Sequence, residues 1–272
     1  MIFFASKEKT EDLLYQAMSL MEKKQPKSAI SFFKKIIKQD PKNIDALYNQ
    51  GIALNQLRKY QDAITCFDKV LEINPKHITA INNRGIALAE LGNTDDALEY
   101  YNKAIEIDPK YAAAHYNKGV LYDKLLQHEE AIQSLDEAIK CDSGNVNTAF
   151  YRGVVLGKIK KHEEALNCFE NIHRKHPKHM DAFFHKGMEL AELGKHERAL
   201  EIFDKLFQIH EGNVNVIYAM ARSNAAIDNV GKALYLLEQA VKKDRKTIKK
   251  WALEDEFFDS LRDEPKFRKL IM

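Results

Sequence analysis

A strict period of 34 residues organises this chain of 272 residues. An alanine followed by Ile or Leu recurs seven times at that spacing, at Ala29, Ala63, Ala97, Ala131, Ala165, Ala199 and Ala233. Glycine recurs with the same period, at Gly51, Gly85, Gly119, Gly153 and Gly187. Because the copies stay in register over the chain, the sequence predicts a stack of short repeats rather than one globular core.

Each repeat is predicted to contain two helices. In the second copy, apolar and small residues follow helical spacing over residues 47–54 and again over residues 63–71. The link around Leu57 is short, so the two helices must run antiparallel. Pro75 ends the second helix, because the residue before a proline avoids the α region. The recurring Gly and Ala let the helices approach closely, where a larger side chain would overpack the interface.

Seven helix pairs account for most of the chain. A lead-in over residues 1–9 precedes them and a tail over residues 248–272 follows, and the pairs are expected at residues 10–43, 44–77, 78–111, 112–145, 146–179, 180–213 and 214–247.

The tail is expected to form a helical cap over the seventh repeat. Thr247 is predicted to cap a helix that carries Trp251. The apolar side chains that would cover the last repeat are Phe257, Phe258, Leu261, Phe267 and Leu270. A stack of repeats needs such a cover for its exposed apolar end. A separate binding segment is the alternative function for the tail.

Composition argues against several classes of protein. Lys+Arg 42 against Asp+Glu 40 leaves a net charge of +2, which gives no support for a nucleic-acid-binding surface. No apolar run reaches about 18 residues, so neither a spanning helix nor a membrane partner is expected. The start lacks the basic segment of a signal peptide, and the three cysteines include no CxxC pair. A cytoplasmic protein with reduced thiols is therefore expected.

The repeats resemble the tetratricopeptide repeat (TPR) family. Tyr48-Asn49-Gln50-Gly51 and Tyr116-Asn117-Lys118-Gly119 look like the first-helix core of that family, and Asn74-Pro75 and Asp108-Pro109 look like its terminator. The resemblance covers residues 10–247 and is weakest in the seventh repeat, where Asn224 and Arg245 depart from the pattern. It implies an all-α fold, an α/α right-handed superhelix, whose first helices line a concave groove that binds proteins or peptides.

The resemblance also assigns residues to that groove. They are Tyr48, Asn49, Asn82, Asn83, Tyr116, Asn117, Phe150, Tyr151, Phe184, His185, Tyr218 and Arg222. Amide side chains suit the backbone of an extended peptide because each both donates and accepts, and aromatic side chains suit apolar anchors. Alternatively, the aromatic residues pack between neighbouring first helices and the Asn residues are family consensus. The lysines and arginines with which chaperone-binding members hold a C-terminal carboxylate are absent, which argues against a receptor for chaperone tails.

A basic stripe accompanies the groove positions, at Arg84, Lys118, Arg152 and Lys186. It suits an acidic peptide. It also motivates a second hypothesis, an RNA-binding helical repeat, which the net charge opposes. The plainer interpretation is that these long side chains cover helix surface and pair with carboxylates such as Asp108 and Asp142.

No catalytic motif is found in the sequence. His173, His176 and His179 recur at steps of three, but Pro177 interrupts the helix between them, so a metal-binding or enzymatic protein is the least favoured hypothesis. Cys66 and Cys168 lie beside predicted core phenylalanines and are expected to be buried or half-buried thiols rather than nucleophiles. The sequence thus predicts a non-catalytic adaptor without cofactors, monomeric or weakly self-associating, whose partner is another protein or a peptide.

Overall fold

The computed structural model describes the backbone of residues 2–271 and the side chains of residues 10–271. Helices alternate in two series. The first helices of the pairs are α1 (Ile2–Glu22), α3 (Ile44–Gln56), α5 (Ile78–Glu90), α7 (Ala112–Lys124), α9 (Val146–Lys158), α11 (Met180–Glu192) and α13 (Val214–Ala226). The second helices are α2 (Pro26–Gln39), α4 (Tyr60–Ile73), α6 (Thr94–Ile107), α8 (His128–Cys141), α10 (His162–Lys175), α12 (His196–Ile209) and α14 (Val230–Lys243). The tail adds α15 (Arg245–Glu254), a 3₁₀ helix η1 (Glu256–Leu261) and α16 (Pro265–Ile271).

The all-α class and the series of tandem helix pairs are confirmed. No strand occurs over residues 2–271, and from α3 to α13 each first helix begins 34 residues after the previous one. The backbone of residues 2–9, assigned to a lead-in, forms the start of α1, whereas Met1 and Met272 lie outside the described residues.

The same turn joins the two helices of every repeat. Its central residue adopts a left-handed conformation, with φ between 56° and 85°, at Lys24, Arg58, Gly92, Leu126, Lys160, Gly194 and Asp228. The next residue then donates its backbone N–H to a carbonyl near the end of the first helix, as Lys59 does to Leu54 at 2.9 Å. This is the Schellman arrangement, which satisfies carbonyls at a helix end. It also reverses the chain within a few residues, so each second helix runs back along the first.

Side-chain caps start most of the first helices. The oxygen of Asn43 accepts from the N–H of Ala46 at 3.0 Å, and Asn145 and Asn213 cap α9 and α13 in the same way. His77 and His179 do so through Nδ1. Such caps satisfy N–H groups that have no partner within the helix.

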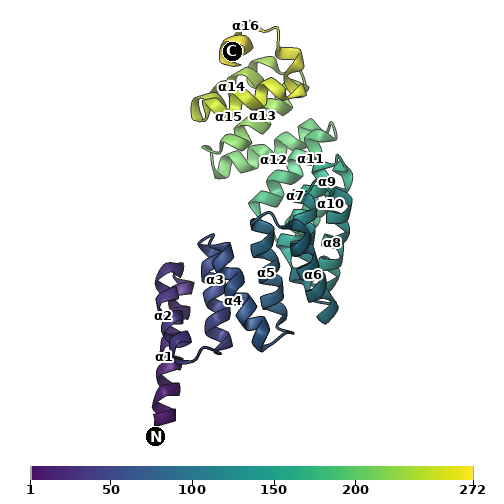
Figure 1. The fold of residues 1–272 in the computed structure, drawn as a ribbon. Helices are drawn as coiled ribbons and strands as arrows, with labels where there is room; N and C mark the ends of the chain where they lie inside the picture. Colours follow the sequence, from purple (N-terminus) through teal and green to yellow (C-terminus); the bar gives the residue numbers. More distant parts are fainter. Residues whose placement is uncertain (1, 272) are drawn as a thin grey trace. The chain divides into compact units, whose positions relative to one another are not determined.

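The chain forms two compact units, residues 1–144 and 145–272. Within the first unit, Figure 1 shows α1 with α2 and α3 with α4 as neighbouring antiparallel pairs. The recurring glycines explain their close approach. A Cβ built on Gly51 would lie 2.5 Å from a ring carbon of Phe67, and one on Gly187 would lie 2.6 Å from Phe203. Each glycine therefore admits a large side chain from the second helix of its own repeat.

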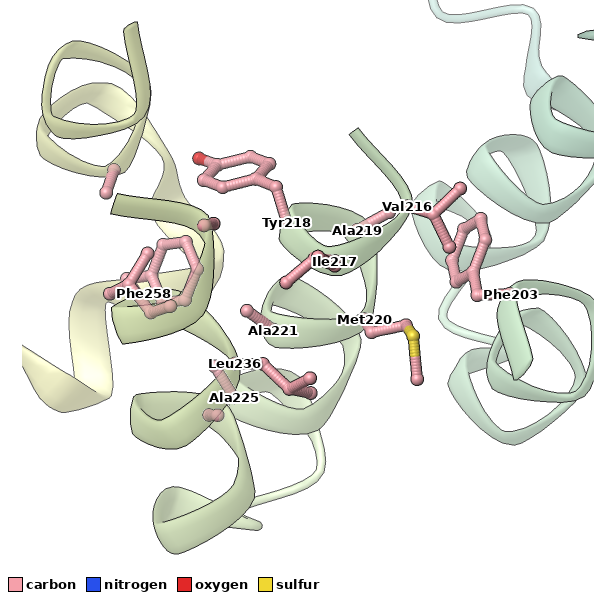
Figure 2. Packing of buried hydrophobic residues seen from close by; sticks show 14 of the residues in the cluster. Phe203, Val216, Ile217, Tyr218, Ala219, Met220, Ala221, Ala225, Leu236 and Phe258 are labelled. Atoms are coloured by element: carbon pink, nitrogen blue, oxygen red, sulfur yellow. The ribbon is translucent and has the colours of Figure 1, made fainter. Parts of the chain in front are cut away.

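The tail covers α13 and α14 in the second unit. Phe258, Leu261, Phe267 and Ile271 are buried in the same apolar cluster as these two helices. Figure 2 shows Phe203 on one side of α13 and Phe258 on the opposite side. The helix that carries Trp251 begins before the expected Thr247. Asp244 caps it by accepting from the N–H of Thr247, so Thr247 is inside α15.

Candidate functional site

In the first unit, the first helices α5 and α7 enclose a small pocket of about 90 Å³. Its apolar wall includes Ile86 and Val120, which occupy the ninth position of their repeats. Glu90 and Lys124, both at the thirteenth position, form an ion pair of 2.6 Å beside it. The hydrogen bond from Lys124 lowers the pKa of Glu90. Tyr60 adds a hydrogen bond of 3.3 Å to the same carboxylate.

In the second unit, α9 and α11 enclose a larger pocket of about 420 Å³ from the same positions. Val154 and Met188 occupy the ninth position, and Lys158 and Glu192 the thirteenth. Phe184 and His185 also line it. A groove with apolar walls and charged edges therefore recurs on the first helices of both units.

Glu189 is a buried carboxylate that lines the pocket in the second unit. Its Oε2 lies 2.7 Å from Nδ1 of His162, and its side chain is 9% exposed. Burial raises the pKa of Glu189, and the His162 contact opposes that rise. A Cβ on Gly157 would lie 2.6 Å from Oε1, so only glycine leaves room for the carboxylate there.

Glu189 was not among the residues predicted from the sequence, although the sequence carries a signal for it. The tenth position of the other repeats holds apolar or small residues, namely Ser19, Ala53, Ala87, Leu121, Val155 and Ser223. A single carboxylate at a position of that kind is the departure that marks this pocket.

In the first unit, the groove amides bind one another and the helix backbone. Asn117 donates to Oδ1 of the buried Asn82 at 2.9 Å. Asn83 donates both to the hydroxyl of Tyr48, at 3.2 Å, and to a backbone carbonyl of its own helix. Asn49 likewise donates to its own helix at 2.8 Å. Asn83 and Asn117 thus join neighbouring first helices, and the amide groups of Asn49, Asn83 and Asn117 all donate within the fold.

Apart from the buried Tyr218, the predicted aromatic residues are half-buried, and several pack on the second helices. Tyr48 lies 6.1 Å from Phe67, ring centre to ring centre, and Phe150 lies 5.6 Å from Phe169. Phe184 lies 5.8 Å from Phe203 and also reaches the pocket.

Three further groove candidates are also half-buried. Burial raises the pKa of Tyr116, and Tyr151 has intermediate exposure. His185 stacks on Phe169 at 5.1 Å, and burial lowers the pKa of its imidazole.

The C-terminal tail contacts the predicted groove residues of the seventh repeat, Tyr218 and Arg222. The hydroxyl of Tyr218 donates to Asp255 at 2.8 Å, and the guanidinium of Arg222 lies 2.6 Å from the same carboxylate oxygen. Arg222 also pairs with Glu192 at 2.9 Å and stacks over the ring of Phe257 at 4.3 Å. The chain's own tail therefore occupies the place that Tyr218 and Arg222 were expected to offer to a partner.

The basic stripe joins neighbouring helices. Arg84 pairs with Asp68 at 2.5 Å, and Lys186 pairs with Glu170 at 3.2 Å. Lys118 donates to Asn102 at 2.8 Å, and Arg152 donates to the sulfur of Cys168 at 3.2 Å.

The expected carboxylate partners of the stripe were wrong. Asp108 and Asp142 accept instead from the backbone N–H groups of Lys110 and Gly144, in the turns after α6 and α8. The stripe that motivated the RNA hypothesis is thus engaged within the fold.

The three histidines of the proposed metal cluster have different roles. His173 stacks on Phe183 at 4.2 Å, His176 follows the end of α10, and His179 caps α11. Over the part of the chain that the structure describes, no group of three or more His, Cys, Asp or Glu side chains is placed to hold a metal ion.

Burial raises the pKa of the Cys66 thiol to about 11, so this sulfur is uncharged at neutral pH. None of the described helices is long and apolar enough to cross a membrane.

Models of the tetratricopeptide repeat match residues 43–110, 82–146 and 152–213. The chain belongs to the tetratricopeptide repeat family. Proteins of this family are generally non-catalytic scaffolds that bind other proteins or peptides. A model of subunit 3 of the anaphase-promoting complex, cyclosome, also matches residues 2–70. No curated protein matches the sequence.

Solved TPR structures share the fold. YrrB, described as a TPR protein with an unusual peptide-binding site, is 25% identical with a TM-score of 0.59, over 70% of this chain and 98% of its own. A tetratricopeptide repeat protein from Parabacteroides merdae is 22% identical with a TM-score of 0.62, over 89% of this chain and 97% of its own. The pilF protein of Pseudomonas aeruginosa is 21% identical with a TM-score of 0.64, over 78% and 97%.

Proposed function

We propose that this protein is a non-catalytic adaptor that binds a peptide segment of another protein in the groove of its first helices. The observation that carries the proposal is the recurrence of a pocket between first helices in both units. In each, the ninth positions supply aliphatic or thioether walls and the thirteenth positions supply charged edges. Apolar anchors surrounded by polar groups are typical of peptide-binding surfaces.

The pocket between α9 and α11 is the favoured anchor site. Its volume of about 420 Å³ is within the range that accommodates small ligands, whereas 90 Å³ in the first unit is below it. Val154, Phe184 and Met188 suit an apolar side chain. The peptide-binding site named for YrrB, which is 25% identical, supports the same type of ligand.

The structure changes which residues of the groove should be tested. Phe150 packs on Phe169, and Tyr218 is occupied by the tail, so substitutions there alter the fold as well as the groove. Met188 is half-buried, lines the pocket and is the better probe.

Selection from a library of displayed random peptides tests the proposal. Peptides selected on the full chain should bind Met188→Asp about tenfold more weakly or worse, because a carboxylate then stands on the apolar wall. Tyr235→Asp, on the exposed side of α14, is the matched control and should bind as the unsubstituted chain does. Failure to select any peptide, or equal binding by both variants, would contradict the proposal.

A further inference from the structure

A second groove lies between the second helices α2 and α4 of the first unit. It has a volume of about 670 Å³ and is lined by α2, α4 and one face of α3. From α3 it takes Leu47, Gln50 and Leu54, none of which lies at the ninth or thirteenth position that lines the first-helix groove. This groove is therefore a separate surface.

The floor of this second groove is apolar. Leu47 and Leu54 are almost fully buried beneath it, and Ile30, Ile37 and Leu57 are partly exposed along it. Cys66 contributes an uncharged thiol, which behaves as a small apolar group. The floor therefore offers aliphatic contact area to an incoming side chain.

The edges of this groove are strongly basic. They carry Lys27, Lys34, Lys59 and Lys69, against the single carboxylate of Asp62. All four lysines are exposed, and none of them forms an ion pair with another described residue. The charge is thus available to a ligand.

The excess of charge is local to this place in the repeat series. Helix α2 carries four lysines and no carboxylate, whereas each of the other second helices carries at least one Asp or Glu. The equivalent groove between α6 and α8 is lined by Asp136 and Glu137 as well as by Lys118 and Lys140, so its charges balance. There, the positions of the four lysines are taken by Asp95, Asn102, Gln127 and Glu137. Repeat architecture alone does not require a basic groove.

We propose that the groove between α2 and α4 binds an acidic segment of a partner protein, whose apolar side chains contact the floor and whose carboxylates face Lys27, Lys34, Lys59 and Lys69. Four cations facing one anion provide the charge complementarity that steers and orients such a segment. The aliphatic floor provides apolar surface whose removal from water on binding stabilises the complex. An amphipathic helix or an extended strand satisfies both demands.

The lining favours a protein over other anionic partners. Single-stranded nucleic acids are held by aromatic side chains that stack on bases, and no residue of this lining is aromatic. A lipid surface is bound by apolar side chains that project into it, whereas here the apolar residues form the floor of a trough.

Binding of a designed peptide to the full chain tests this inference. The probe is a labelled helical peptide with Leu at every third or fourth position and Glu at most others. Two matched peptides replace Glu by Lys or Leu by Ser. Fluorescence anisotropy should show binding of the Leu/Glu probe alone, weakening between low and moderate salt because exposed charges are screened.

Charge reversal then locates the site. Lys34→Glu with Lys69→Glu should weaken binding of the probe by about tenfold or more. Lys205→Glu with Lys232→Glu changes the net charge equally at exposed positions outside this groove and should leave binding unchanged. Met188→Asp should also leave it unchanged, which separates this surface from the proposed peptide groove.

Several outcomes would overturn the proposal. They are equal affinity of the Lys34→Glu/Lys69→Glu variant, equal binding of the Ser-substituted probe, and tighter binding of single-stranded RNA or anionic vesicles than of the Leu/Glu peptide. A dimer that the same double substitution dissociates would assign the groove to a second copy of the chain and reject a separate partner.

Discussion

The guanidinium of Arg222 lies 2.6 Å from the carboxylate of Asp255 and joins the last repeat to the tail. Each side chain is only 12% exposed. The hydroxyl of Tyr218 donates to the same carboxylate, and burial together with that carboxylate raises the pKa of Tyr218. A groove position of the seventh repeat thus serves as an attachment point for the chain's own C-terminal segment.

Removing the carboxylate should loosen the tail selectively. Asp255→Ala leaves Arg222 without this partner in a poorly hydrated place, which costs about 1–3 kcal/mol. Hydrogen exchange should report faster exchange of amides in residues 245–271, with α3 to α7 unchanged, because repeats interact mainly with their neighbours. Glu254→Ala, at an exposed site on the same segment, should leave exchange as it is. Uniform acceleration over the whole chain would mean that Asp255 acts on more than the tail.

The turn at Leu126 should gain stability from glycine. Leu126 has φ of 60°, a region that costs a side chain about 1 kcal/mol, and it is 77% exposed, so no packing is lost. Thermal melts should therefore show Leu126→Gly to be more stable by up to about 1 kcal/mol. Leu126→Ala retains the strain and should not stabilise the chain. At Gly92, where φ is 85°, substitution by Ala should lower the melting temperature. No difference between the Gly and Ala variants at Leu126 would show that the left-handed conformation is not strained.

Overpacking should identify which face of α6 is buried. Ala97 is fully buried, whereas Glu99, two residues along the same helix, is exposed. Ala97→Leu forces three extra carbons into a filled interface and should destabilise the first unit by about 1–3 kcal/mol. Glu99→Leu should change stability by less than about 0.5 kcal/mol. Urea denaturation followed by circular dichroism measures the stability of both variants. Equal destabilisation by the two substitutions would show that the assigned repeat register is wrong.

The sequence predicted the features that repeat, and missed those that depend on contacts peculiar to one place. The approach of Gly51 to Phe67 recurs in other repeats, so its register was visible in the spacing alone. The bond between Asn82 and Asn117 joins separate repeats, and the partner of an amide cannot be read from its position. Nor does the sequence show that Asp255 folds back on Arg222, because that contact requires the path of the tail.

The same reasoning applies to the turns and to the basic groove. Glycine at Gly92 signals a left-handed residue, but Leu126 adopts that conformation without the signal because the Schellman hydrogen bonds require it. The lysines at the edge of the second groove are far apart in the sequence. Lys34 and Lys69 line the same groove only because α2 and α4 both pack on α3.

Acid should weaken the second unit partly through His185. Its imidazole packs against both Phe150 and Phe169, with ring centres 5.2 and 5.1 Å away. Burial lowers the pKa of His185, against a smaller opposing effect of Asp181. The unfolded chain, where a histidine has a pKa of about 6.5, therefore binds more protons than the folded chain below that pH. The stabilisation from neutral His185 is fully present above about pH 6.5 and is lost as the pH falls toward the folded value.

His185→Gln removes this titration, so the fall in urea midpoint between pH 7.5 and pH 5.5 should be smaller than in the unsubstituted chain. A residual fall is expected, because burial also lowers the pKa of His173 and His196. Glu189 acts in the opposite direction, since its pKa is raised and its contribution is lost as the pH rises. The comparison of variant with parent cancels these shared contributions. If the urea midpoint falls equally between pH 7.5 and pH 5.5 in the variant and the parent, His185 has the same pKa in the folded and unfolded chains.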